Sequence, residues 1–268
     1  MNEPKHRPRK KWGQNFLRNQ GAVRKIVDAL DAPPDELVLE IGPGEGALTR
    51  RLAELRNPLR VIEIDPDLAA KISAELGARI DVVEGDATTV DLPTVPFTAV
   101  GNLPYNVGTP ILRRVVRSEA LRRAVFMLQK EVADRITAAP GEESYGFLTL
   151  AVRIYADARR LMILEPSSFH PRPKVRSAVV VIDRLERRLE TPPQELEGLI
   201  STSFRMPRKK LLNNLIGYRE LDRTRAAAAI EQAGLPPDCR ADRVSLDQFD
   251  RLGSVIASFR DVSPLPRP

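Results

Sequence analysis

The residues best suited to chemistry stand where short apolar runs of the sequence end. The run 37–41 stops at a glycine-rich turn, residues 42–47, in which Gly42 and Gly44 precede a new helical pattern. Glycines between a strand and a helix let the backbone turn tightly and approach a nucleotide closely. The same glycines would also serve an ordinary tight turn, so the motif gains meaning only with a second element.

Two carboxylates supply that second element. Glu63 ends the next apolar run, about 20 residues beyond the glycines, where a carboxylate can accept hydrogen bonds from both hydroxyls of a ribose. Asp86, followed by Ala87, comes after a third run and suits the amino group of an adenine. Because the carboxyl ends of parallel strands share one crevice, these groups predict a nucleoside site that fits NAD or S-adenosylmethionine.

A tetrapeptide at the end of a fourth run distinguishes between these cofactors. Asn102, Leu103, Pro104 and Tyr105 resemble the tetrapeptide by which amino-methyltransferases hold a planar exocyclic amine. The lone pair of an adenine N6 is delocalised, so attack on a sulfonium methyl needs acceptors for its two hydrogens. The Asn102 side-chain oxygen and the Leu103 carbonyl can supply them. Tyr105 can stack on an extruded base while Pro104 restricts the loop, which predicts methyl transfer from S-adenosylmethionine without a dedicated general base.

These groups need a mostly parallel sheet with helices on both faces to position them. The alternation of strands and helices is typical of a Rossmann-like α/β domain, here one that uses S-adenosylmethionine for methyl transfer. Strands are predicted over 37–41, 59–64, 80–83, 97–101, 124–128, 160–164 and 178–182, and helices over 19–30, 47–55, 66–76, 109–117, 129–138 and 145–156.

The pattern changes near residue 185. Two prolines, Pro192 and Pro193, open a stretch with helical spacing and no convincing strand. Helices are expected there over 194–204, 208–216, 223–233 and 245–259. The predicted organisation is a flexible basic arm (1–18), the Rossmann-like methyltransferase domain (19–184), a small all-α C-terminal domain (185–260) and a disordered tail (261–268).

Composition excludes several classes of protein. One cysteine rules out an internal disulfide framework, and with only two histidines a zinc or other metal site is not expected. No apolar run approaches the roughly 18 to 20 residues that span a bilayer, and the basic N-terminus lacks the apolar stretch of a signal peptide. We therefore expect a cytoplasmic protein that does not bind membranes.

The charge is unevenly distributed along the chain. Residues 28–100 hold 6 basic and 15 acidic side chains, a net charge of −9, although the whole chain carries +6. Basic clusters recur at 5–11, 113–123, 172–176 and 205–210. A single charge run is usually a solvated face, but this recurrence favours a partner with a phosphate backbone.

Six motifs, in order, resemble the ribosomal small-subunit RNA adenine dimethyltransferase family, over about residues 10–260. The tetrapeptide and the glycine turn belong to them, and together the six are far more specific than the glycine turn alone. They occupy residues 13–17, 40–44, 61–65, 102–106, 126–132 and 169–180.

This resemblance implies N6,N6-dimethylation of two adjacent adenosines near the 3′ end of small-subunit (16S) ribosomal RNA, with S-adenosylmethionine as methyl donor. The implied partner is the immature small ribosomal subunit, and a monomer is expected. The resemblance also implies that Phe169 sandwiches the target base opposite Tyr105. The residues that it places in the methyl-donor site are Asn15, Leu17, Gly42, Gly44, Glu63, Asp86, Ala87 and Asn102.

RNA contacts are expected from the basic clusters and from the family's helical second domain. Pro207 departs from the family pattern, because many relatives carry a basic residue there; this puts RNA contact at that position in doubt. The expected RNA-binding residues are Lys10, Lys11, Arg113, Arg114, Arg172, Lys174, Arg208, Lys209 and Lys210.

Two other functions compete with this interpretation. The first is an erythromycin-resistance type of methyltransferase acting on large-subunit ribosomal RNA, which shares the fold and a similar tetrapeptide. The long helical tail and the residues of the 169–180 motif argue against it. The second is mainly an assembly factor that binds nascent small subunits, with catalysis secondary. A DNA adenine methyltransferase fits less well, since those enzymes usually carry two prolines and an aromatic residue after the first position of the tetrapeptide.

Overall fold

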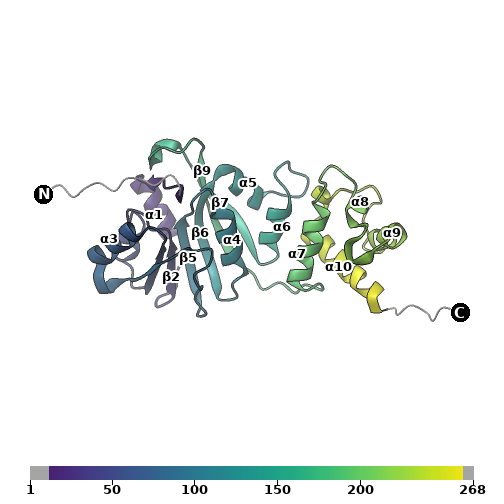
Figure 1. The fold of residues 1–268 in the computed structure, drawn as a ribbon, viewed down its shortest axis with the longest axis horizontal. Coiled ribbons are helices and arrows are strands. Elements are labelled where there is room, and N and C mark those ends of the chain that lie inside the picture. Colours follow the sequence, from purple (N-terminus) through teal and green to yellow (C-terminus); the bar gives the residue numbers. More distant parts are fainter. Residues whose placement is uncertain (1–11, 262–268) are drawn as a thin grey trace. The chain divides into compact units, whose positions relative to one another are not determined.

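The computed structural model describes residues 12–261, and its centre is a seven-stranded sheet in the order β4-β3-β2-β5-β6-β9-β7 (Figure 1). Every neighbouring pair is parallel except the two that involve β9, which runs opposite to β6 and β7. The expected mostly parallel sheet is therefore confirmed. The strands are β2 (Leu37–Ile41), β3 (Leu59–Glu63), β4 (Asp81–Glu84), β5 (Phe97–Asn102), β6 (Leu121–Gln129), β7 (Ala156–Leu164) and β9 (Ser177–Arg184).

The central strands are apolar on both faces because helices cover both. On one face, alternate residues such as Val38, Val61 and Val100 pack with α1 (Gln20–Asp28), α2 (Thr49–Leu52) and α3 (Pro66–Leu76). Such burial on two sides explains why β2 and β5 are continuous apolar runs. The remaining helices that follow strands are α4 (Gly108–Arg117), α5 (Lys130–Thr137) and α6 (Phe147–Arg153).

Capping residues set the starts of two helices. The Asn19 side chain accepts a hydrogen bond from the Ala22 amide at the start of α1, and Asp65 does the same for Asp67 at the start of α3. Pro66 occupies the first position of α3, where a missing N–H costs nothing. The α2 helix is only 4 residues long, shorter than the helical pattern over 47–55 predicts.

A second, two-stranded sheet was not expected. Here β1 (Phe16–Leu17) pairs antiparallel with β8 (Phe169–His170), so the last residues of the predicted basic arm are ordered against the rest of the chain. Strands of two residues give no readable alternation, which is why periodicity misses them.

By its internal packing the chain divides into two compact units. The first contains the sheet and comprises residues up to Ala133 with Ala156–Arg184, and the second comprises Asp134–Tyr155 with the residues from Leu185 onward. The second unit resumes at Leu185, close to the predicted change, and it also includes 134–155, which the sequence analysis placed with the sheet. Leu150 of α6 and Ile154 directly after it belong to the core of the helical unit, so burial of these apolar side chains places the segment there.

The second unit is helical throughout its described part after residue 185. Its core gathers apolar side chains from all its major helices, with Phe249 and Leu252 fully buried. The helices are α7 (Pro193–Ser203), α8 (Leu211–Leu215), α9 (Arg223–Gln232) and α10 (Leu246–Asp261). In residues 12–261 no helix is long and apolar enough to cross a membrane.

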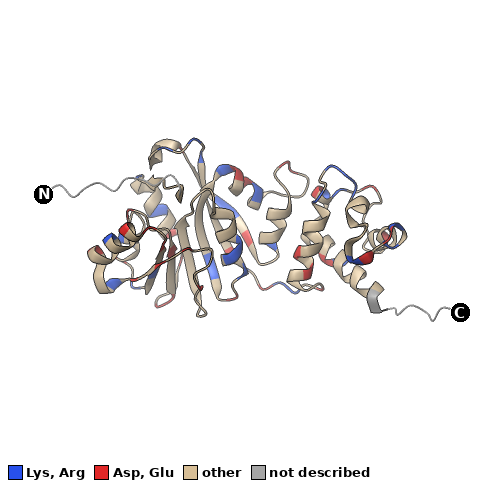
Figure 2. Ribbon diagram, in the orientation of Figure 1, with Lys and Arg blue, Asp and Glu red and all other residues tan. Residues whose placement is uncertain are grey.

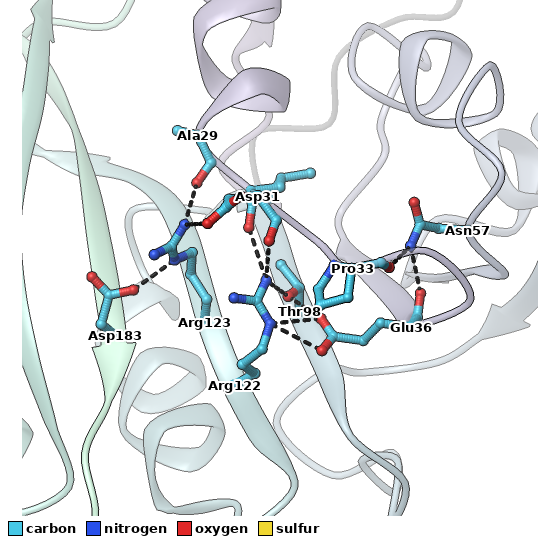
Figure 3. A network of polar contacts seen from close by, with 10 residues as sticks. Ala29, Asp31, Pro33, Glu36, Asn57, Thr98, Arg122, Arg123 and Asp183 are labelled. Atoms are coloured by element: carbon cyan, nitrogen blue, oxygen red, sulfur yellow. Dashed lines mark hydrogen bonds and ion pairs between the residues drawn. The ribbon is translucent and has the colours of Figure 1, made fainter.

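Arg122 of β6 ties together the amino-terminal ends of three neighbouring strands (Figure 3). Its Nε lies 3.0 and 2.9 Å from the two carboxylate oxygens of Glu36, which precedes β2. Its Nη2 donates to the Thr98 hydroxyl of β5 at 2.8 Å and to the Leu30 and Asp31 carbonyls. Arg123 beside it pairs with Asp183. These two arginines of the basic cluster 113–123 are thus engaged within the fold.

Candidate active site

An open cavity lies at the carboxyl ends of β2, β3, β4 and β5, where ligands bind in open α/β sheets. About 950 Å³ of space there, open solvent included, is free of atoms. It is lined by residues 12–17, 40–45, 47–48, 62–64, 85–87, 102–105, 107 and 111. The four motifs singled out for chemistry therefore meet in one place.

The glycine turn leaves room for both a neighbouring ring and a ligand. Gly42 and Gly44 have φ values of +69° and +56°, a backbone conformation that favours glycine. A Cβ on Gly44 would stand 2.9 Å from the ring of Phe16, so any side chain there would displace the segment that covers the turn. Glycine at this position thus has a steric cause in addition to a conformational one.

Glu63 is held by the backbone on either side of it. Its carboxylate accepts hydrogen bonds from the Gly44 amide at 3.0 Å and from the Asp65 amide at 2.9 Å. The side chain is only 5% exposed, and this burial raises the pKa of the carboxyl, while the two backbone donors act in the opposite direction. The Ile64 amide also acts on this carboxylate, and since a carboxylate has about four acceptor positions, acceptor capacity remains for a ligand.

Asp86 presents one free oxygen. Its Oδ1 accepts from the backbone N–H of Thr88 at 2.8 Å and from the Thr88 hydroxyl at 2.7 Å. No described residue donates to Oδ2. Asp86 and its neighbour Ala87 both line the cavity, as the sequence predicted.

The tetrapeptide loop fixes the orientation of its asparagine. Asn102 Nδ2 donates to the carbonyl of Asn15 at 2.7 Å. A carbonyl can only accept, so this bond determines which end of the amide is nitrogen and leaves Oδ1 as an acceptor for another donor. The Leu103 amide donates to Met127 O of β6 at 3.1 Å, which anchors the loop to the sheet.

Tyr105 is positioned through its hydroxyl. That group lies 2.6 Å from the Ser177 hydroxyl at the start of β9. Half-burial raises the pKa of the phenol, which keeps it neutral, and the ring still lines the cavity. The ring therefore stands at the wall next to Asn102 with its rotation restricted.

The model of the ribosomal RNA adenine dimethylase family matches residues 5–257. The chain belongs to this family. The resemblance predicted from six motifs is confirmed, and with it the class of enzyme, an adenine dimethyltransferase of ribosomal RNA.

Relatives of this family resemble the chain over nearly its whole length. The ribosomal RNA small subunit methyltransferase A of Methylococcus capsulatus is 39% identical over 91% of this chain and 96% of its own. The protein of the same name from Myxococcus xanthus is 38% identical over 95% and 93%.

Solved structures agree on the fold. A dimethyladenosine transferase from Plasmodium falciparum superposes with a TM-score of 0.80 at 25% identity, over 92% of this chain and 98% of that one. The 23S rRNA methyltransferase ErmE gives 0.73 at 29% identity, over 91% and 100%. The Rossmann-like methyltransferase fold predicted from the sequence is thereby confirmed.

The two positions that only the family resemblance suggested, Asn15 and Leu17, both line the cavity. Asn15 contributes its carbonyl to Asn102, and the neighbouring Gln14 side chain donates to Asp65 at 3.0 Å. The segment 12–17 thus forms part of the cavity wall.

Phe169, expected from the family resemblance to stack on the target base, is a buried residue in this structure. Its side chain is 3% exposed, it belongs to β8, and it packs in the core on the α1 side of the sheet. It does not line the cavity. The ring is enclosed by apolar neighbours in this structure, and the stacking of a target base on it stays a prediction.

Glu40 is a cavity residue that the sequence analysis did not single out. It is 1% exposed, and its Oε2 has no hydrogen-bond partner in the described part of the chain. Burial raises the pKa of this carboxyl to about 8, and the charge of Glu63 adds to the effect. An acid inside an otherwise apolar strand, 37–41, was the available signal.

The expected RNA-binding residues have different surroundings. Arg172, Lys174 and the segment 208–210 are exposed, and Figure 2 shows the basic run before α8 as a continuous blue loop. Arg113 and Arg114 are half-buried in α4, and Arg114 donates to backbone carbonyls of the Asp86 loop. Lys10 and Lys11 lie outside the described residues.

Proposed function

We propose that this enzyme transfers methyl groups from S-adenosylmethionine to N6 of two adjacent adenosines near the 3′ end of small-subunit ribosomal RNA. The observation that carries the proposal is the Asn102 amide, whose nitrogen is held by Asn15 O so that its oxygen is available to an amine. The names of the relatives from Methylococcus and Myxococcus support the small subunit as the source of the RNA.

The cavity fits the methyl donor. Glu63 has acceptor positions for ribose hydroxyls, Asp86 Oδ2 is available for an adenine amino group, and Gly44 keeps the turn free of side chains. Asn15, Leu17 and Ala87 complete the proposed contacts. When bound, S-adenosylmethionine would supply an electrophilic methyl carbon on a sulfonium.

The chain's contribution to the transfer is acceptance and positioning. Asn102 Oδ1 and the Leu103 carbonyl accept the two N6 hydrogens, which localises the nitrogen lone pair for attack on the methyl carbon. Tyr105, held by Ser177, stacks on the base, and Pro104 limits the motion of the loop. The methylated nitrogen is acidic enough to lose its proton to water, so no residue is needed as a base.

The proposal includes RNA contacts at Arg172, Lys174 and Arg208–Lys210, which are exposed cations. Arg113, Lys10 and Lys11 are proposed with them on charge alone. The proposal also includes the immature small ribosomal subunit as substrate, a monomeric state and a cytoplasmic location. Each of these is an expectation from the sequence and the family resemblance.

Asn102→Ala and Asn102→Asp test the role of the amide. We expect Asn102→Ala to lower the methylation rate of small-subunit particles by about a hundredfold or more, the usual cost of losing a positioned acceptor or donor. Asn102→Asp keeps an acceptor but loses the donor to Asn15, so it should retain intermediate activity. Undiminished turnover of Asn102→Ala, with donor and particle binding intact, would contradict the role.

Glu63→Ala tests the donor site separately. The dissociation constant of S-adenosylmethionine should rise while that of the RNA stays nearly unchanged, because the proposed target of Glu63 is the ribose of the donor. Equal loss of both affinities would contradict the assignment.

A further inference from the structure

Arg114 was expected to contact RNA, but its guanidinium binds inside the protein. Nη1 donates to Val90 O at 2.6 Å and to Ala87 O at 3.3 Å, and Nη2 donates to Thr89 O at 3.5 Å. Three carbonyls of one short loop, 86–90, are therefore bound by a single side chain from α4.

This loop, 86–90, is one isolated helical turn. The amides of Thr89 and Val90 both donate to Asp86 O at 2.9 Å, the spacings of a 3₁₀ and an α turn. A turn that stops leaves its last carbonyls without intrahelical partners, and cationic side chains commonly bind such carbonyls. Arg114 serves as that cap.

The loop is the cavity wall at Asp86 and Ala87. Ala87 lines the cavity, and its carbonyl accepts a hydrogen bond from Arg114. The same residue therefore borders the proposed site of S-adenosylmethionine and is fixed by Arg114. A Cβ on Gly85 would come within 2.5 Å of Val90 Cγ2, which shows how tightly the loop closes on itself. This packing, together with the hydrogen bonds from Arg114, leaves the Asp86 backbone little freedom to move.

Arg114 also connects this wall to the tetrapeptide loop. It stands in α4 (Gly108–Arg117), the helix that begins directly after the tetrapeptide loop and places Ile111 in the cavity. One rigid helix thus ends the Asn102 loop and clamps the Asp86 loop. A guanidinium presents its donors in a rigid planar arrangement, which suits several carbonyls at fixed positions better than the single point charge of a lysine.

We propose that Arg114 is a positioning residue for the methyl donor, which fixes Asp86 through the 86–90 loop, and not an RNA contact. The inference rests on the proposed function of the cavity. It predicts that replacing Arg114 changes the affinity for the donor and leaves the electrostatic contribution to RNA binding as it was.

The variants are Arg114→Gln, Arg114→Lys and, as a matched control from the exposed surface of the same helix, Arg117→Gln. Donor affinity is measured from the fluorescence of Trp12, the only tryptophan of the chain and a cavity-lining residue. RNA affinity is measured over a range of salt concentrations, and steady-state kinetics give KM for the donor and kcat at saturation.

For Arg114→Gln we expect the donor Kd and KM to rise about tenfold, equivalent to about 1.4 kcal/mol, with kcat at saturating donor within about twofold of the parent. Arg114→Lys should restore part of the affinity, and Arg117→Gln should bind the donor like the parent. The slope of log K for RNA against log salt should be unchanged in Arg114→Gln, since a lost phosphate contact would reduce it by about 0.7 to 0.9.

An unchanged donor Kd with a reduced salt slope in Arg114→Gln would overturn the inference and make Arg114 an RNA contact. A loss of kcat and RNA binding together with a lowered melting temperature, in both Arg114 variants, would reduce its role to stability and also overturn it. If the parent itself binds no S-adenosylmethionine, the proposed function fails instead, which separates the two failures.

Discussion

Glu40 provides a prediction that is independent of any ligand. Its side chain lies on the same face of β2 as Val38, two residues earlier. It is 1% exposed and carries one oxygen that has no partner among the described residues. Burial raises its pKa from 4.5 to about 8. The folded protein therefore holds this proton far more tightly than the unfolded chain, and Glu40→Gln replaces the protonated acid with a neutral side chain of the same shape.

The sign of the pH effect follows from the raised pKa. The favourable contribution of protonated Glu40 is complete below the ordinary pKa of 4.5 and is lost as the pH rises toward about 8. Each pH unit in that window changes the free energy of unfolding by up to about 1.4 kcal/mol. Between about pH 5 and about pH 8 the parent should lose up to about 4 kcal/mol that Glu40→Gln does not lose.

Urea unfolding at several pH values measures this difference. The fluorescence of Trp12 reports on the unit that contains Glu40, so the transition of the helical unit does not confuse it. Glu84→Gln, which removes an exposed carboxylate from β4, is the matched control and should follow the parent. Parallel pH profiles for the parent and Glu40→Gln would refute the account of a buried neutral acid.

Three further predictions concern stability, positioning and RNA binding. Arg122→Ala should lower the free energy of unfolding by about 2 to 4 kcal/mol in urea titrations, because the nearly buried Glu36 carboxylate loses its partner; a change within about 0.5 kcal/mol would contradict this. Ser177→Ala should raise KM for the RNA more than it lowers kcat, since it frees the Tyr105 ring, and an unchanged KM would contradict the positioning role. RNA association should weaken steeply between low and high salt, and a flat response would argue against the proposed phosphate contacts.

The sequence was sufficient to predict the sheet and the meeting of the four motifs. Each motif follows a strand directly, and parallel strands bring their carboxyl ends to one edge, so the positions of Glu63, Asp86 and Asn102 follow from topology. The long apolar runs that define the strands need no knowledge of partners. This is why the sequence alone predicts the candidate site.

What the sequence could not provide was the partner of each side chain. Arg114, Arg122 and Arg123 look alike in a basic cluster, yet in the structure they bind carbonyls and carboxylates of the same chain. Phe169 stands beside exposed basic residues in the sequence but is packed in the core. The charge and hydrophobicity of a side chain do not determine whether it contacts solvent, a ligand or a neighbouring element.

Helices between strands raise the same difficulty at a larger scale. The segment 134–155 lies between β6 and β7, so chain order places it in the sheet domain. Its amphipathic pattern only requires an apolar surface to pack against, and the structure provides that surface in the core formed with Leu196 and Leu199. Packing against a specific partner, which no local pattern encodes, decides the unit to which it belongs.

Methyl transfer from labelled S-adenosylmethionine to undermethylated small ribosomal subunits, followed by nucleoside analysis, tests the central claim most directly. The account predicts N6,N6-dimethyladenosine confined to small-subunit RNA, at two adjacent positions near its 3′ end, and its loss in Asn102→Ala. Label in large-subunit RNA would contradict it in favour of a resistance-type enzyme, and tight particle binding without label in the parent enzyme would contradict it in favour of an assembly factor.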